Sequence, residues 1–169
     1  SSGPYVAMVI MLGCRALIWA RWMVKPLLLV FGLACVGIEI LSNRPFYSVV
    51  GEFVALDAET AWYRTQLINV AIKHVGEYWM SGYGLSDPGW GPEIAGLKNT
   101  DIVNHYVYVA ILGGLGGLFA YLGICIAAMH SVTRVFRASR TAWLRQLSWG
   151  LGSTMIALMV AFWSGALFT

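Results

Sequence analysis

The sequence has few charged residues. Asp, Glu, Lys and Arg together make up 11% of the 169 residues, whereas hydrophobic residues make up 59%. A typical globular chain is about 25% charged and roughly 45–50% apolar, so this chain has too few charges to cover a water-facing surface. Intrinsic disorder is also excluded, because it requires low hydrophobicity and high net charge. The composition therefore predicts an integral membrane protein.

Cysteine is scarce as well. The three cysteines, Cys14, Cys35 and Cys125, each lie within an apolar run. An odd number of cysteines in such runs is typical of small hydrophobic side chains and not of a disulfide framework or a redox centre. The sequence has no Cys-x-x-Cys or His-Glu-x-x-His motif, so no metal site is predicted. The net charge of +3 is small and unevenly placed, which argues against nucleic-acid binding.

Acidic residues are absent from both ends of the sequence. All eight lie between Glu39 and Asp101, where four basic residues leave a balance of −4, and the rest of the chain has seven basic residues and no acid. Residues 102–133 and 146–169 contain no Asp, Glu, Lys or Arg. Each stretch exceeds the about 20 mostly apolar residues that a membrane-spanning helix needs. The two apolar stretches predict two spans in the second half of the sequence. The separation of acidic from basic residues is typical of segments on opposite sides of a bilayer.

The first half of the sequence predicts another helical hairpin. Residues 4–20 and 26–41 are apolar except for one charge each, and a basic turn at 21–25 separates them. The second basic turn, at 131–145, lies between the last two spans. Short basic loops stay in the cytoplasm, and two spans separate these turns, so both turns can be cytoplasmic at once. The acidic segment is then extracytoplasmic.

The predicted fold is all-α: a polytopic integral membrane protein with about four transmembrane helices and a large extracytoplasmic loop. The expected parts are a transmembrane hairpin at 1–41, an extracytoplasmic (periplasmic) loop at 42–103 and a second transmembrane hairpin at 104–169. The turn at 131–145 is expected in the cytoplasm. We expect the sequence to be a fragment of a larger polytopic protein, because it lacks an initiator Met and stops in or at the end of an apolar span.

An amphipathic helix is predicted within the loop, over about residues 58–80, with Asp57 as its N-cap. One residue, Arg64, lies within the apolar face of this helix. It could snorkel to lipid headgroups or pair with an acid such as Glu39. Alternatively, it could bind a buried anionic ligand, because its rigid fork suits phosphate. The apolar face is predicted to comprise Ala61, Thr65, Ile68, Ile72, Val75 and Trp79.

Two further groups of residues are candidates for function. Tyr83 and Trp90 lie in a segment rich in glycine and proline and could stack on sugar rings or anchor the chain at the membrane interface. Asp101, Asn104 and His105 gather where the third span begins. A histidine there can take up a proton near neutral pH, and a carboxylate can orient it. Equally, the group can be a polar cap that satisfies free backbone N–H groups.

A run of glycines follows in the same span. Gly113-Gly-Leu-Gly-Gly117 lacks the spacing of a nucleotide-binding motif. Small residues let transmembrane helices approach closely, so we interpret the run as a packing site or a kink.

Four short motifs occur in one order: Ala61-Trp-Tyr-Arg-Thr-Gln-Leu67, Gly82-Tyr-Gly84, Asp101-Ile-Val-Asn-His-Tyr-Val107 and Gly113-Gly-Leu-Gly-Gly-Leu118. This order resembles the C-terminal signature region of the O-antigen polymerase and O-antigen ligase superfamily, over roughly residues 40–125. In that family an arginine on an outer-loop helix precedes a Gly-x-Gly turn, and an Asn/His/Tyr cluster opens a glycine-bearing span. The opening Ser1–Tyr5 departs from the family pattern, since Ser2 stands where an arginine is common.

The resemblance implies a multi-pass enzyme of the bacterial inner (cytoplasmic) membrane that makes surface polysaccharide, O-antigen or exopolysaccharide. Its substrate would be a glycan on undecaprenyl diphosphate, transferred to an acceptor glycan or lipid without cofactor or metal. Arg64 would hold the diphosphate and stabilise its charge as it leaves. His105 would deprotonate the acceptor hydroxyl. The residues that would position His105 or the sugar are Asp101, Asn104 and Tyr106.

Within the superfamily, the order Asp-x-x-Asn-His-Tyr favours a polymerase over a ligase that joins glycan to a lipid A core. If polymerases use no histidine base, His105 would bind sugar instead. A transporter or structural membrane subunit is the alternative from another class. Transporters usually place ionisable residues near the bilayer midplane, whereas the polar cluster here is expected at the outer surface.

Overall fold

The computed structural model describes residues 3–41 and 58–164. All regular structure within these ranges is helical, which confirms the predicted class. The elements are α1 (Gly3–Ala16), the short 3-10 helix η1 (Arg21–Met23), α2 (Val24–Leu41), α4 (Ala58–Lys73), α5 (Val75–Tyr78), α6 (Gly91–Ala95), α7 (His105–Ala138) and α8 (Ala142–Ser164).

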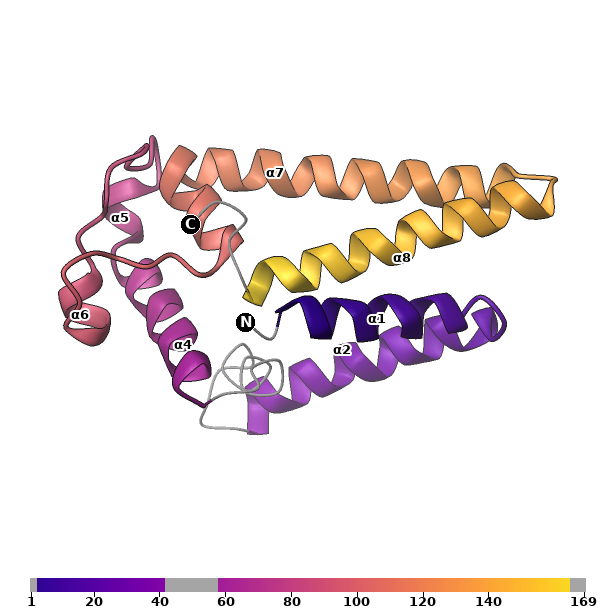
Figure 1. Ribbon diagram of the computed structural model, residues 1–169, viewed down its shortest axis with the longest axis horizontal. Coiled ribbons are helices and arrows are strands. Elements are labelled where there is room, and N and C mark those ends of the chain that lie inside the picture. The colour runs from indigo at the N-terminus through magenta and orange to yellow at the C-terminus, as the bar shows by residue number, and fades with distance from the viewer. Residues whose placement is uncertain (1–2, 42–57, 165–169) are drawn as a thin grey trace.

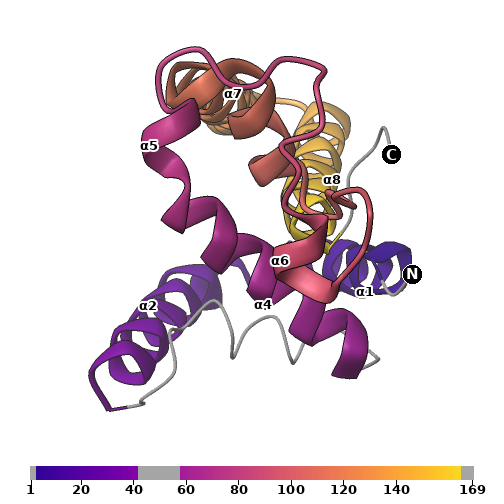
Figure 2. The ribbon, with the colours of Figure 1, turned by 90° about the vertical axis from the view of Figure 1, so that its left-hand side faces the viewer.

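The axes of the four long helices are roughly aligned, with α1 and α2 forming one antiparallel hairpin and α7 and α8 another, and α8 packs against both α1 and α7 (Figure 1). The turn that joins α1 to α2 and the turn that joins α7 to α8 lie at the same end of the molecule. The shorter helices α4, α5 and α6 lie across the opposite end, as the view from that side shows (Figure 2). The two basic turns therefore share one end, and the segment that carries most of the described acidic residues lies at the other.

Two helices, α7 and α8, are long and apolar enough to cross a membrane by length and composition. Their most apolar windows are only 17% buried, whereas the core helix of a soluble protein is mostly buried. The helices α1 and α2 are also apolar, but their 14 and 18 residues reach about 21 and 27 Å, less than the ~30 Å of a bilayer core. Within the described ranges, two helices and not the predicted four meet the length criterion.

The helix α7 is broken at Gly113 and Gly114, where the backbone dihedrals are not helical. His105 and Tyr121 would lie about 24 Å apart along a straight helix, at 1.5 Å per residue. Their ring centroids are instead 5.4 Å apart. The segment before the break therefore folds back along the segment after it, and the prediction of a kink in this glycine run is confirmed.

A turn around Gly82 docks at this break. The amide of Tyr83 donates a hydrogen bond to the Ile111 carbonyl over 2.6 Å, and the amide of Leu115 donates to the Trp79 carbonyl over 2.9 Å. The docked turn thus satisfies backbone groups that the interrupted helix leaves open. Gly82 has a φ of +70°, and a Cβ there would lie 2.4 Å from the Ile111 carbonyl oxygen. Only glycine fits this approach.

We expect Gly82→Ala to lower the free energy of unfolding by at least about 2 kcal/mol, because the left-handed backbone alone costs roughly 1–2 kcal/mol for a non-glycine residue. The clash with Ile111 adds to that cost. Gly84→Ala is the matched control: Gly84 has a similar φ of +64°, but a Cβ added there would have nothing within 4 Å. Thermal unfolding of the purified variants measures both effects. Equal destabilisation by the two substitutions would contradict the docked arrangement.

The helix predicted over residues 58–80 is shorter than expected, because α4 ends at Lys73 and α5 follows after a break at His74. Its buried face also differs from the predicted one. Ile72 and Trp79, both assigned to the apolar face, are exposed. The buried residues of α4 are Ala61, Arg64, Leu67, Val70 and Ala71.

Tertiary packing explains why the buried face of α4 differs from the predicted one. Leu67 and Val70 belong to a core that also contains Ile94 of α6 and Ala110 of α7. Contacts with α6 and with the start of α7 therefore determine which side of α4 is buried. The predicted N-cap Asp57, the side chain of Glu39 and Ser2 lie outside the described residues.

Candidate functional site

Arg64 lies on the buried face of α4, and only 4% of its surface is exposed. Its neighbours along this face, Ala61 and Leu67, are apolar and buried. Burial lowers the pKa of the Arg64 guanidinium from its ordinary value. Arginine nevertheless keeps its proton in proteins, so the structure places a permanent cation inside the packed end of the molecule.

Tyr63, next to Arg64, connects α4 to the segment that enters α7. Its hydroxyl donates a hydrogen bond to the Asp101 carbonyl over 2.9 Å and accepts one from the Asp101 amide over 3.1 Å. Asp101 itself is exposed. The two hydrogen bonds place Asp101, four residues before His105, beside the helix that carries Arg64. Arg64 on α4 is thereby linked to the segment that carries Asp101 and His105.

Asn104 and Tyr106 fix the start of α7. The Asn104 side-chain oxygen accepts hydrogen bonds from the amides of Tyr106 and Val107, over 3.0 and 3.2 Å, so the interpretation of Asn104 as a helix cap is confirmed. Its amide nitrogen donates to the Trp163 carbonyl over 3.3 Å. The Tyr106 hydroxyl donates to the Met159 carbonyl over 2.7 Å. Both residues therefore attach this end of α7 to α8, and through it they position His105.

His105, the first residue of α7, is buried, with 6% of its surface exposed. Its ring packs among aromatic side chains, at centroid distances of 4.8 Å to Phe162, 5.4 Å to Tyr121 and 6.1 Å to Tyr108. Its Nδ1 atom is buried and has no hydrogen-bond partner among the described residues. A buried polar atom without a partner is costly, so this nitrogen is suited to bind a hydroxyl that reaches it.

Trp90 belongs to the hydrophobic core at the end of the molecule formed by α4, α5 and α6, and Tyr83 packs against that core. Trp90 is buried and stacks on His74 at 5.6 Å, with Tyr78 at 5.8 Å and Tyr83 at 6.0 Å between ring centroids. The Tyr83 hydroxyl donates a hydrogen bond to Glu77. These contacts give both residues a packing role that neither the sugar-stacking nor the interface-anchor interpretation included.

An ionic cluster that the sequence analysis missed lies beside these rings. His74 Nδ1 is 2.8 Å from a Glu77 carboxylate oxygen, and its Nε2 is 3.0 Å from Glu93, which also pairs with Lys73. Hydrogen bonds with Glu77 and Glu93 raise the pKa of His74. Hydrogen bonds from Tyr83 and His74 lower the pKa of Glu77, and those from Lys73 and His74 lower the pKa of Glu93. The spacing of His74 and Glu77 was visible in sequence, but only the fold brings Glu93 to them.

We expect the packing of α6 on α4 to be strongest between about pH 4.5 and 6.5. The raised pKa of His74 contributes stability that is complete below about 6.5 and is lost as the pH rises through the folded-state value. The lowered pKa values of Glu77 and Glu93 contribute stability that is complete above about 4.5 and is lost on acidification. Hydrogen-exchange protection factors of the α6 amides should follow this window. His74→Gln should remove the decline above pH 6.5, and protection that is independent of pH in the native chain would contradict the assignment.

No cluster of His, Cys, Asp and Glu within residues 3–41 and 58–164 could hold a metal ion. Comparisons of the chain with protein-family models, with curated proteins and with solved structures gave no match. The resemblance to the O-antigen polymerase and ligase superfamily therefore stays a prediction that depends on the four motifs and their order.

Proposed function

We propose that this chain belongs to a membrane enzyme that polymerises glycan repeat units carried on undecaprenyl diphosphate, at the outer face of the bacterial inner membrane. The burial of Arg64 supports this proposal most strongly. Only 4% of the Arg64 surface is exposed, and arginine is rarely buried in proteins, so a cation held within the apolar face of α4 is consistent with a functional role. The planar guanidinium fork matches the geometry of a diphosphate held at a membrane surface.

The arrangement of the helices supports the proposed orientation. The basic turns lie at one end of the molecule, and α4, α5 and α6 lie at the other (Figure 1). Positively charged short loops remain in the cytoplasm, so we place α4 and Arg64 on the extracytoplasmic side. Lipid-linked repeat units would then meet Arg64 at the outer leaflet. In this proposal α1 and α2 complete a set of four spans.

The proposed reaction is a glycosyl transfer. His105 takes the proton of an acceptor hydroxyl, and that oxygen bonds to the anomeric carbon of the lipid-linked glycan. The bond between this carbon and the phosphate oxygen breaks, and undecaprenyl diphosphate leaves with the electron pair. Arg64 stabilises the negative charge that develops on the leaving diphosphate. Because His105 is buried among aromatic rings, side chains around it must move to admit the acceptor.

The decisive experiment supplies the protein that contains this chain, reconstituted in vesicles, with a repeat unit on undecaprenyl diphosphate. A polymerase lengthens the glycan into a ladder of products with release of undecaprenyl diphosphate. When a finished polymer on undecaprenyl diphosphate is supplied together with lipid A core, a ligase transfers the polymer to that core without lengthening it. If the protein catalyses neither extension nor transfer, that result contradicts the proposal and favours a structural membrane subunit. The contacts of Asn104 and Tyr106 with α8 also fit such a role.

A further inference from the structure

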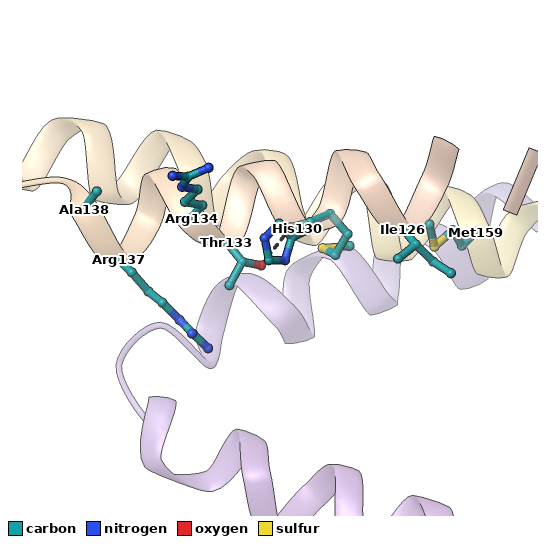
Figure 3. A pocket seen from close by; sticks show the side chains of 8 residues that line it. Ile126, His130, Thr133, Arg134, Arg137, Ala138 and Met159 are labelled. Carbon is teal, nitrogen blue, oxygen red and sulfur yellow. Dashed lines mark hydrogen bonds between the residues drawn. The ribbon is translucent and has the colours of Figure 1, made fainter. Parts of the chain in front are cut away.

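A second candidate site lies at the basic end of the molecule, far along α7 from His105. A cavity of about 750 Å³ opens beside α7 and α8. Seven of its lining residues belong to one face of α7, and Met159 comes from α8. The lining residues are Ile126, Met129, His130, Thr133, Arg134, Arg137, Ala138 and Met159 (Figure 3).

The cavity is polar at one end and apolar at the other. Figure 3 shows Arg134 and Arg137 at the end near the α7–α8 turn, and Ile126 and Met159 at the opposite end. His130 lies between these groups. The cavity lies along α7, which is long and apolar enough to cross a membrane. Such a cavity suits a ligand with an anionic head and a hydrocarbon tail.

The two helices that line the cavity carry no acid that could neutralise its two arginines. The sequence has no Asp or Glu after Asp101, which excludes α7 and α8, and none before Glu39, which excludes α1. The helix α8 packs against both α1 and α7. Arg134 and Arg137 are both exposed, so an anionic group from outside these helices can reach them.

We infer that this cavity binds an anionic phospholipid, with its headgroup at the end that carries Arg134 and Arg137 and an acyl chain along Ile126, Met129 and Met159. Basic pockets between transmembrane helices on the cytoplasmic side are suited to acidic headgroups. A free phosphate ion would satisfy only the polar end and leave the apolar end unfilled. The inference shares the membrane placement of the proposed function but is independent of glycosyl transfer.

Native mass spectrometry of the purified chain in a neutral detergent tests the inference with phosphatidylglycerol and phosphatidylcholine as probes. We expect the chain to retain phosphatidylglycerol and not phosphatidylcholine. The double variant Arg134→Gln/Arg137→Gln should retain it roughly 25-fold less well, since each basic residue near an anionic surface contributes about fivefold. Arg140→Gln is the control for a general effect of charge, because Arg140 lies in the adjacent α7–α8 turn, is exposed like Arg134 and Arg137, and does not line the cavity.

Two further arms separate a lipid from a free anion. Inorganic phosphate should fail to displace phosphatidylglycerol, and Ile126→Ser should weaken its retention without removing a charge. Ile126 is 68% exposed, so this substitution should leave the fold intact, which circular dichroism checks. Equal retention of phosphatidylcholine, an equal loss per removed charge in the double variant and in Arg140→Gln, or displacement by inorganic phosphate would overturn the inference.

Discussion

Replacing Arg64 with alanine should reduce glycan chain extension by about 100- to 1,000-fold, the loss typical of removing one preorganised group that stabilises transition-state charge. The variant would lose the cation that holds the diphosphate and that stabilises its charge as it leaves. In cells, the polysaccharide should shorten to single repeat units. Gel analysis of the polysaccharide and the vesicle assay measure this effect.

Two variants separate this role from packing. Arg64→Met keeps much of the side-chain volume and should also be inactive, and Arg64→Lys keeps the charge but loses the planar fork that can bind a diphosphate through two hydrogen bonds. Lys98→Ala, which removes an exposed cation from the same segment, should extend glycans normally. Melting temperatures and membrane insertion report on folding. Normal chain length from Arg64→Met and Arg64→Lys would refute the assignment.

His105→Gln should lower kcat by about 100- to 10,000-fold, the contribution typical of a general base. Glutamine approximates the size of the ring and keeps a polar group beside the aromatic side chains, so the packing against Phe162 and Tyr121 should largely persist. The rate of the native protein should fall on acidification as His105 becomes protonated, and the residual rate of the variant should lose that dependence.

The same measurement distinguishes a base from a sugar-binding residue. If His105 only binds sugar, His105→Gln should raise KM and leave kcat and its pH dependence unchanged. Asp101→Asn should alter the pH profile only if the exposed carboxylate orients the ring. A kcat within twofold of the native value would exclude His105 as the base.

Local features of the sequence predicted several local features of the structure. The glycine run at residues 113–117 predicted a packing site or a kink, and α7 is broken at Gly113 and Gly114, where Gly114 adopts a positive φ that glycine readily allows. Asn104 stands directly before an apolar helix, and its side chain caps that helix. Such effects depend on neighbouring residues alone, so sequence contains enough information for them.

Features that depend on tertiary contacts were predicted less well. Periodicity identified a helix around Arg64, but the buried side of α4 depends on Ile94 and on the start of α7, which lie far along the chain. The contact between His74 and Glu93 forms because the chain turns back between α5 and α6. The burial of Trp90 has the same origin, and it could not be distinguished from an exposed aromatic residue by composition.

The proposed placement of α4 outside the membrane is the central claim, and cysteine accessibility tests it most directly. In a variant whose three native cysteines are replaced by alanine, Leu85→Cys introduces a thiol at a position that is 91% exposed in the loop after α5. Arg140→Cys introduces one in the α7–α8 turn. A membrane-impermeant maleimide should label Leu85→Cys with the inner membrane intact and Arg140→Cys only after that membrane is disrupted. The reverse pattern would place Arg64 on the cytoplasmic side and contradict the account.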